Sequence, residues 1–300
     1  MSSYIARINK ALEYIDQHLD EEINVSKLAN ISGFSLYHFH RIFKANVRES
    51  PYDFLLRLRL EKAIFLLKYR RQLSIAEVGY ESGFSSPENF SRLFKERYEV
   101  TPGTYRKNTE LHKSRIHQER QENDFYIRIE QSREMPKASF TLEIEQMPET
   151  PVVVAKAIFG ADGSGLVEKY LSLMDWAQEH GINIKGNMTR FGMSIDNPEV
   201  TPASKYRYDF ALKVEGNPPL AEGLEWSSIP STEYATVHAQ GSLDTVAQAW
   251  DYIYRDWLPN SGYVPEHLPA VEEFIQGPEE IGWEKFNLKC RVPITKTENE

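Results

Sequence analysis

A short phrase of sequence occurs twice near the start of this chain. Residues Ser32–Ser35 read Ser-Gly-Phe-Ser, and residues Ser82–Ser85 repeat the same four letters. Each phrase stands between a short and a longer helical pattern, and its glycine can take the left-handed conformation that a tight turn between helices needs. Each copy therefore predicts a helix–turn–helix. Two copies about fifty residues apart are much harder to produce by chance than one, because any two packed helices can mimic a single unit.

Helical spacing and capping residues give the expected elements of this region. Proline fits the first turn of a helix, so we expect a long helix from Pro51 to Lys68. At 1.5 Å per residue this helix spans roughly 27 Å, which would hold two recognition helices about one DNA turn apart. The other expected helices are Tyr4–Leu19, Val25–Ile31, Leu36–Asn46, Ile75–Glu81 and Pro87–Tyr98, and the domain closes at Thr101–Arg106.

The net charge of −9 is unevenly distributed along the chain. We count 17 Lys and Arg against 13 Asp and Glu up to Lys107, and 18 against 31 from Asn108 onward. A basic first third joined to an acidic remainder is expected when only one of two domains meets phosphate. Residues 1–107 are therefore predicted to bind double-stranded DNA.

Composition limits the remaining possibilities. A chain of 300 residues, 41% of them hydrophobic, suits two domains with real cores. Its single cysteine, Cys290, argues against a disulfide framework and a thiolate zinc site. His38 and His40 lack metal-ligand spacing on a helix, so no metal and no cofactor are expected. No apolar run approaches membrane-spanning length and the N-terminus lacks a signal-peptide core, so we expect a cytoplasmic protein with no membrane partner.

The last part of the chain contains a second repeat, with a period of about eighty residues. Two strand-like segments, Val152–Phe159 and Tyr234–Gln240, each precede an amphipathic helix with an Asp-Trp pair. The pairs are Asp175-Trp176 and Asp256-Trp257, and the closing strands are Tyr206–Val214 and Phe286–Ile294. This pattern predicts a duplicated strand–helix–strand–strand unit, an α+β fold over residues 141–296. An antiparallel sheet would carry both helices on one face and leave a concave groove between the halves.

The segment between the two domains, residues 108–140, is polar and mixed in charge. We interpret it as a linker with a short strand at Phe125–Ile129. The alternative is a regular surface helix, for which the segment has few apolar anchors.

These motifs resemble known families. Residues 1–107, with both Gly-Phe-Ser turns and the closing Thr-Pro-Gly-Thr-Tyr-Arg, resemble the AraC/XylS-type DNA-binding domain. Residues from about Leu142 to Ile294 resemble the GyrI-like effector-binding domain of multidrug-sensing regulators. The combination is similar to Rob-type two-part transcription factors. It implies a sequence-specific regulator, an activator that would contact RNA polymerase, with a small-molecule effector.

The first recognition helix is expected to bury Phe39 and Phe43, which lie four residues apart on one face. The resemblance places Tyr37, His40 and Arg41 in the major groove. Arg41 is also favoured on physical grounds, because its guanidinium can pair bidentately with guanine O6 and N7. Phosphate contacts are expected from the polar residues Ser35, Lys44, Ser85, Ser91 and Lys95.

In the second recognition helix, Glu88, Asn89 and Arg92 match the groove-facing positions of the family. Asn89 suits adenine, and Glu88 can accept from cytosine N4. Glu88 can instead stabilise the dipole of the helix at its N-terminus, and both interpretations stay open. Ser86 is expected to cap this helix.

The candidate effector residue is Glu272, which shares one face of a predicted strand with Phe274. The resemblance implies a glutamate in an aromatic-walled groove. A desolvated carboxylate among aromatic rings would attract a lipophilic organic cation. The alternative is a solvated acidic strand end, since three more glutamates follow closely. Weaker wall candidates are Tyr208, Trp226, Trp250 and Trp283.

Two other classes of function stay open for the C-terminal domain. Some GyrI-like domains resemble small hydrolases that use a glutamate as general base, although the sequence shows no nucleophile–base pair. The domain could instead bind only protein, for example as a dimerisation module. The sequence leaves monomer and dimer equally open.

Overall fold

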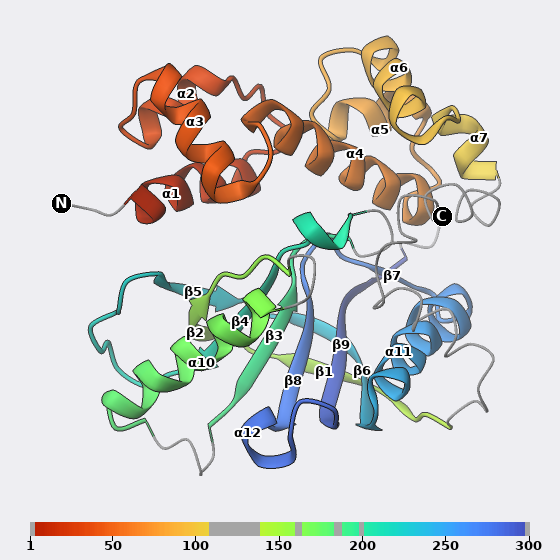
Figure 1. The fold of residues 1–300 in the computed structure, drawn as a ribbon. Coiled ribbons are helices and arrows are strands. Elements are labelled where there is room, and N and C mark those ends of the chain that lie inside the picture. The colour runs from red at the N-terminus through yellow and green to blue at the C-terminus, as the bar shows by residue number, and fades with distance from the viewer. Residues whose placement is uncertain (1–3, 108–138, 160–163, 183–187, 198–200, 298–300) are drawn as a thin grey trace. The chain divides into compact units, whose positions relative to one another are not determined.

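The computed structural model describes residues 4–107, 139–159, 164–182, 188–197 and 201–297 (Figure 1). The chain forms two compact units, which are described separately below. The predicted linker and its strand at Phe125–Ile129 lie outside the described residues.

The first unit is all-helical, as predicted. Its helices are α1 Tyr4–Gln17, α2 Val25–Ile31, α3 Leu36–Val47, α4 Pro51–Tyr69, α5 Ile75–Glu81, α6 Pro87–Tyr98 and α7 Pro102–Lys107. Both helix–turn–helix units are confirmed, with α2 and α3 forming the first and α5 and α6 the second. The turn glycines Gly33 and Gly83 have φ of 64° and 85°, the left-handed values that the sequence predicts.

The two turns differ by one residue. Ser35 caps α3, and its Oγ accepts a hydrogen bond from the backbone N–H of His38. In the second unit the cap is Ser86, whose Oγ accepts from the N–H of Asn89 at 3.1 Å. Ser85 is therefore an additional turn residue, so the two copies are offset by one position from this point onward.

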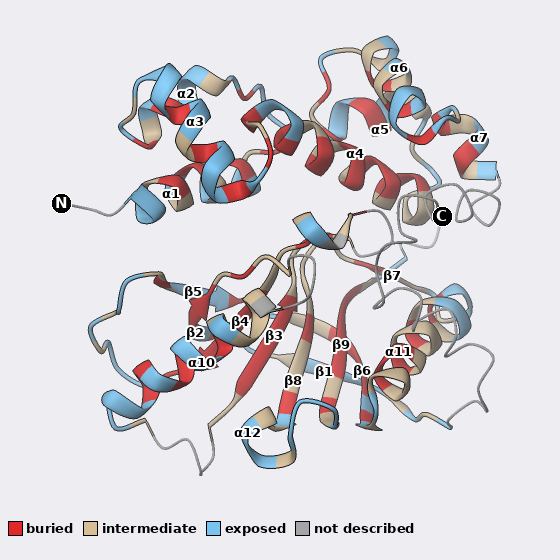
Figure 2. Cartoon of the chain, viewed as in Figure 1, coloured by how far each residue is buried: buried red, intermediate tan, exposed pale blue. Residues whose placement is uncertain are grey.

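Helix α4 is shared between two hydrophobic cores and is buried along most of its length (Figure 2). Its first half, with Phe54 and Leu58, packs with Phe39 and Phe43 in the core of the first helix–turn–helix. Its second half packs with the core of the second unit, whose members include Leu60, Ile64, Leu67, Phe90 and Phe94. One continuous helix thus fixes the two helix–turn–helix units in a single domain.

A close backbone approach also joins the two helix–turn–helix units. A Cβ atom at Gly83 would lie 2.8 Å from Nε of Arg59 and 3.2 Å from Cα of Asp20. Arg59 in turn donates from Nε to the carbonyl of Leu19 at 3.2 Å and from Nη2 to that of Glu21 at 2.7 Å. The loop after α1 is therefore held against the second turn, and only glycine fits there.

The second unit is built on one nine-stranded antiparallel sheet with the order β1-β6-β9-β8-β3-β4-β2-β5, and β7 pairs with β9. The strands are β1 Leu142–Met147, β2 Thr150–Ala155, β3 Arg190–Ser194, β4 Tyr208–Lys213, β5 Leu224–Ile229, β6 Thr232–Gly241, β7 Tyr263–Pro265, β8 Ala270–Gln276 and β9 Phe286–Lys296. The helices are α10 Ser164–Glu179, α11 Leu243–Asp251 and the short α12 Pro278–Ile281.

The predicted duplication is visible in this order. One module is β2-α10-β3-β4 and the other is β6-α11-β8-β9, and they join where β3 pairs with β8. Helices α10 and α11 cover the same face of the sheet, one on each module (Figure 1).

The sheet curls so that its other face becomes an interior. Strands β1 and β2 lie near opposite ends of the strand order, yet only Pro148 and Glu149 connect them. Two connecting residues can span no more than about 11 Å, so the ends of the sheet meet at this corner. The enclosed face carries the core residues Val152, Val154, Phe191, Met193, Ala211, Ile229, Tyr234 and Val271.

The Asp-Trp pairs are not equivalent, which the sequence repeat did not anticipate. Trp176 lies in α10, is buried, and donates from Nε1 to the carbonyl of Pro219 at 3.0 Å. Asp256 and Trp257 lie beyond α11, in a π-helical segment, Tyr252–Trp257. There Trp257 stacks on Tyr263, with ring centroids 5.8 Å apart.

Candidate DNA-binding surface and effector site

Helix α3 separates its apolar and polar residues as its sequence predicts. Phe39 and Phe43 are fully buried, with ring centroids 5.3 Å apart. The predicted DNA-binding residues of this helix are all exposed, and they are Tyr37, His40, Arg41 and Lys44. The helix therefore packs through one face and presents a polar, cationic face to solvent.

Within that face, Arg41 associates with the residue one turn before it. Its Nη1 donates to the hydroxyl of Tyr37 at 3.3 Å, and its guanidinium carbon lies 5.8 Å from the centre of that ring. Tyr37 is 66% exposed, so this pair stands on the surface.

Helix α6 presents a corresponding face with a different arrangement. Glu88, Arg92 and Lys95 are exposed, and Asn89 and Ser91 are half-buried. The Arg92 guanidinium is held on two sides, because Nη1 donates to Glu96 at 2.7 Å and Nη2 donates to Oδ1 of Asn89 at 3.0 Å.

Other arginines of this unit have structural roles, although they count toward its net positive charge. Arg7 donates from Nε to the carbonyl of Ser32 at 2.7 Å and covers the Phe34 ring at 3.5 Å, and Arg106 donates to the carbonyl of Leu73 at 2.7 Å. Because these guanidinium groups hydrogen-bond to backbone carbonyls of their own domain, they are less suited to reading bases than the exposed Arg41 and Arg92.

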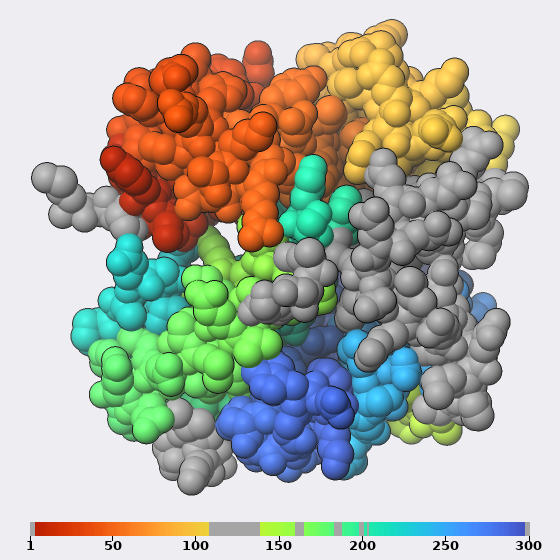
Figure 3. All heavy atoms as spheres, viewed as in Figure 1, coloured from red at the N-terminus to blue at the C-terminus, as the bar shows by residue number. Residues whose placement is uncertain are grey.

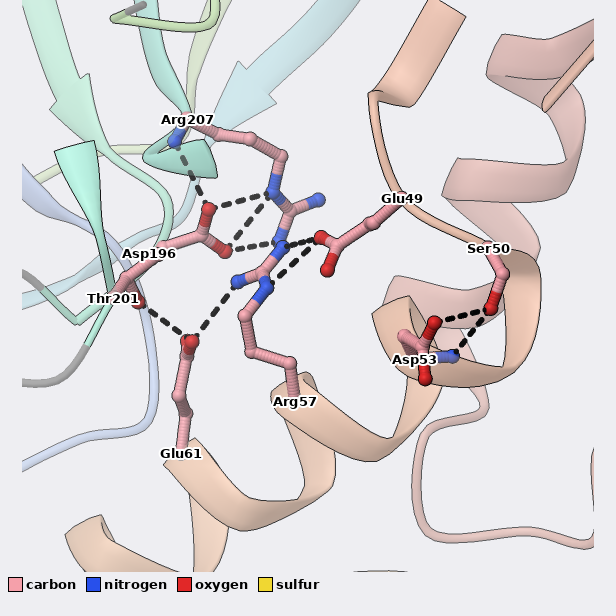
Figure 4. Close-up of polar contacts among 8 residues, drawn as sticks. All are labelled: Glu49, Ser50, Asp53, Arg57, Glu61, Asp196, Thr201 and Arg207. Atoms are coloured by element: carbon pink, nitrogen blue, oxygen red, sulfur yellow. Dashed lines mark hydrogen bonds and ion pairs between the residues drawn. The ribbon is translucent and has the colours of Figure 1, made fainter. Parts of the chain in front are cut away.

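Figure 4 shows a buried ion pair network formed by Glu49, just before α4, with Arg57 and Glu61 of α4. Arg57 donates from Nη2 to Glu49 at 2.8 Å and from Nη1 to Glu61 at 2.9 Å. The same view shows the N-cap of this helix, where Ser50 accepts from the N–H of Asp53. Removing one member would leave buried charge uncompensated, so these residues are structural rather than DNA-reading.

In the second unit, Glu272 lies where the two modules meet. It is half-buried on β8, directly opposite Gly192 on β3, and the two residues are separated in sequence by one period of the repeat. Both carboxylate oxygens accept hydrogen bonds: Oε2 from the hydroxyl of Tyr208 on β4, and Oε1 from Nε1 of Trp250 on α11 at 3.1 Å. Three of the predicted effector residues are thus brought together from one helix and two strands.

Gly192 makes this arrangement possible. Tyr208 reaches Glu272 by lying across β3, and a Cβ atom at Gly192 would overlap the phenol group of Tyr208. A glycine inside a strand often marks such a close approach, so the glycine in the strand pattern is the sequence signal for this contact.

The surroundings of Glu272 disfavour charge. Burial raises the pKa of Glu272 above the ordinary glutamate value, and the hydrogen bonds from Tyr208 and Trp250 partly offset that rise. Burial and the nearby Glu272 carboxylate also raise the pKa of Tyr208 well above its usual range. The same two causes raise the pKa of the Cys290 thiol, which lies opposite Glu272 on β9. A bound cation would therefore stabilise the charged form of the Glu272 carboxylate, which its surroundings disfavour.

Aromatic rings continue from this carboxylate along the helix-covered face. Tyr208 contacts Phe210, Phe210 contacts Tyr170 on α10, and Tyr170 contacts Trp283, with centroids 5.2, 5.2 and 5.4 Å apart. Figure 3 shows that the surface of α10 (green) adjoins that of the segment around α12 (blue). The rings give Glu272 the apolar, polarisable walls that suit an organic cation.

Ion pairs hold the outer end of this row. The Tyr170 hydroxyl donates to Glu279. Buried Arg190 pairs with Glu279 at 2.6 Å and with Glu280 at 3.1 Å. Two of the glutamates that suggested a solvated strand end are thus engaged with a buried arginine.

Phe274 and Trp226 complete the set of predicted wall residues. Phe274 is buried on β8 opposite Arg190. Trp226 lies on the edge strand β5, opposite Val153, and is 39% exposed. Sequence reasoning did not identify Gly192, Phe210 and Arg190, which join this site through strand pairing, or Tyr170, which joins it because α10 packs on the sheet.

Two negative findings concern only the described residues. They contain no group of His, Cys, Asp and Glu side chains suited to a metal ion. No helix among them combines the length and the apolar character needed to cross a membrane.

Comparisons with known proteins agree with both units. Residues 140–295 match the model of the GyrI-like small molecule binding domain, and residues 28–108 match a helix-turn-helix domain model. The uncharacterized HTH-type transcriptional regulator YbfP of Bacillus subtilis is 36% identical over 34% of this chain and 35% of its own length. The HTH-type transcriptional activator RhaS of Enterobacter sp. is 32% identical over 32% of this chain and 34% of its own length.

A solved transcriptional regulator with an AraC-type DNA-binding domain from Chromobacterium violaceum is 27% identical, with a TM-score of 0.32, over 35% of this chain and 92% of that chain. The chain spans about a third of the length of the curated relatives it matches.

The chain belongs to the GyrI-like small molecule binding domain family, and its residues 28–108 contain a helix-turn-helix domain.

Proposed function

We propose that α3 and α6 read two successive major-groove faces of one DNA operator. The observation that carries this proposal is the pair of exposed polar helix faces on a single rigid domain, since α4 is packed into both cores. On α3 the readers are Tyr37, His40 and Arg41, and on α6 they are Glu88, Asn89 and Arg92. Lys44, Ser91 and Lys95 would contact phosphate, which positions the protein without reading bases.

Footprinting of the full chain on a selected operator tests this geometry. We expect protection of two grooves on one side of the duplex, about 10 base pairs apart. Protection of a single groove per protomer would contradict it and would point to the first unit as degenerate, because Tyr37 and His40 are less typical base readers. Binding should also weaken steeply with salt, because phosphate contacts release counterions.

We further propose that the effector is a lipophilic organic cation bound at Glu272. Support comes from a carboxylate with a raised pKa at the junction of the two modules, beside the ring of Tyr208 and the indole of Trp250. A ligand cation gains both Coulomb attraction in a poorly hydrated place and contact with aromatic faces.

A cationic dye titrated into the full chain and into Glu272→Gln tests this effector class. The glutamine keeps the shape and removes the charge, so binding of the dye should largely disappear. A neutral dye of the same shape is the control and should bind both proteins alike. Equal affinity of both proteins for the cation, or tighter binding of an anion, would contradict the proposal.

We assign residues 1–107 to DNA binding, 108–140 to a linker and 141–296 to effector sensing.

The direction of regulation is the last part of the proposed function. The similarity of the first region to RhaS, which is described as a transcriptional activator, supports activation through RNA polymerase in the cytoplasm, where the DNA lies. A run-off transcription assay with and without added protein tests it, and reduced transcript on an unoccluded promoter would contradict it.

A further inference from the structure

The two recognition helices differ at one position that the predicted set of DNA-binding residues leaves out. Arg41 on α3 and Arg92 on α6 occupy equivalent places in the duplicated unit. Four residues later, α3 has Ala45 and α6 has Glu96. Arg92 accordingly has an ion pair with Glu96 at 2.7 Å, whereas Arg41 contacts Tyr37 of its own helix, through a hydrogen bond at 3.3 Å and a guanidinium carbon 5.8 Å from the ring centre.

The stability of α6 does not account for Glu96. The helix ends at Tyr98, so Glu96 lies in its last turn, where an acidic side chain opposes the helix dipole. An arginine four residues before a glutamate is the weaker order for a helical ion pair. Both side chains are more than half exposed, at 59% and 58%, and such exposed pairs stabilise a fold little.

Attraction to DNA does not account for Glu96 either. Glu96 lies one turn from Arg92 and thus on the same side of α6, opposite the buried Phe90 and Phe94. A carboxylate there would repel the phosphate backbone. The explanation for Glu96 that remains is its effect on the conformation of the Arg92 side chain.

We infer that Glu96 is a positioning residue that holds Arg92 ready for base recognition, an inference that rests on the proposed DNA-binding function. Glu96 takes one N–H of Nη1 and Asn89 takes one N–H of Nη2. Nε–H and the other two Nη hydrogens stay available for guanine O6 and N7. An arginine already fixed by two partners loses less side-chain freedom on binding, so its base preference is sharper.

This role also changes what Asn89 does. Bidentate recognition of adenine needs the Oδ1 atom of the asparagine as acceptor, and here Oδ1 accepts from Arg92. Asn89 therefore supports the arginine from the side opposite Glu96. Arg41, without an equivalent of Glu96, would read its base pair with weaker preference.

Selection of bound sequences from random duplex DNA, with the full chain, tests the inference. Glu96→Gln keeps the size of the side chain and removes its charge. We expect preference at the one base pair read by Arg92 to fall by about threefold to tenfold, with the other positions unchanged. The matched variant Ala45→Glu should sharpen the preference at the base pair read by Arg41. Equal melting temperatures of the variants and the wild type show that folding is intact.

A double-mutant comparison separates positioning from any direct effect. In the Arg92→Ala background, Glu96→Gln should no longer change base preference. The inference would be overturned if Glu96→Gln left the motif unchanged or weakened base preference equally at every position. It would also be overturned if Glu96→Gln caused the same loss of preference in the Arg92→Ala background. If the wild type itself selects no motif, the proposed function fails before any variant is compared.

Discussion

The two functional regions of this chain hold their charged groups in opposite ways. Arg41 and Arg92 are exposed, and the contacts described for them come from their own helices, within one turn. Glu272 is half-buried, and its partners come from another strand and from a helix. The DNA-facing residues are therefore arranged locally, whereas the effector site exists only after the two modules have paired.

This difference separates stability from function in one region and couples them in the other. A substitution on the exposed face of α3 or α6 should change DNA binding and leave folding intact. A substitution around Glu272 should change folding, the pH dependence and ligand binding together. The following predictions test that separation, beginning with the largest expected effect.

Gly192→Ala should give the largest change. The added methyl group overlaps the Tyr208 side chain, and overpacking of this kind typically costs about 1–3 kcal/mol. Thermal unfolding should show the loss, and the cationic dye should no longer bind. Gly103→Ala in α7 is the control, because a Cβ atom there meets no atom within 4 Å. If both variants melt alike, Gly192 is not required for the close approach.

Arg92→Ala and Arg41→Ala should each lower affinity for the selected operator by about 1–3 kcal/mol. Arg92→Ala should also cause the larger loss of preference for the contacted base pair. Their melting temperatures should stay close to that of the wild type, because these side chains are exposed. Competition binding against an operator changed at the contacted base pair measures the effect. A large thermal destabilisation would instead show that these arginines are structural, like Arg57.

Stability of the second unit should depend on pH through Glu272. Its pKa is raised in the fold, so the folded state holds a proton that the unfolded state has already lost. The contribution of Glu272 to stability is therefore lost as pH rises from the ordinary glutamate pKa of about 4.3 through the raised value. Denaturant titrations from acid to neutral pH should show this slope in the wild type and not in Glu272→Gln. The same slope in both would assign it to other groups.

The smallest effect is expected at the ends of the recognition helices. Arg48 and Glu99 cap α3 and α6 in the left-handed conformation, with φ of 65° and 60°. Glycine adopts this conformation without a Cβ penalty, so Arg48→Gly and Glu99→Gly should each stabilise by up to about 1 kcal/mol. Denaturant midpoints of the two variants test whether the two copies behave alike, and destabilisation by either would contradict this account.

The same contrast explains how far the sequence could be interpreted. The helices of the first unit were predictable nearly to their ends, because capping serines, prolines and the Gly33 and Gly83 turns act within a few residues. The duplication in the second unit was also predictable from its strand pattern. The second Asp-Trp pair was misplaced, because nothing local marks the change from α11 to a π-helical segment.

The effector site was only partly predictable. The motif around Glu272 indicated the carboxylate, but its neighbours depend on which strands pair. Tyr208 reaches Glu272 only because β3 lies between them and has a glycine at the crossing. Arg190 and Tyr170 join through Glu279, far away in the sequence. Contacts of this kind follow from strand register, which residue spacing alone does not give.

The most direct test of the central claim is sequence selection from random duplex DNA with the full chain, repeated with Arg92→Ala and with Glu272→Gln. The account predicts a motif of two half-sites about 10 base pairs apart, one of which is lost in Arg92→Ala. The whole motif should persist in Glu272→Gln. A motif with one half-site, or one that survives without Arg92 and disappears without Glu272, would contradict the division into a locally built DNA reader and an effector site built where two modules pair.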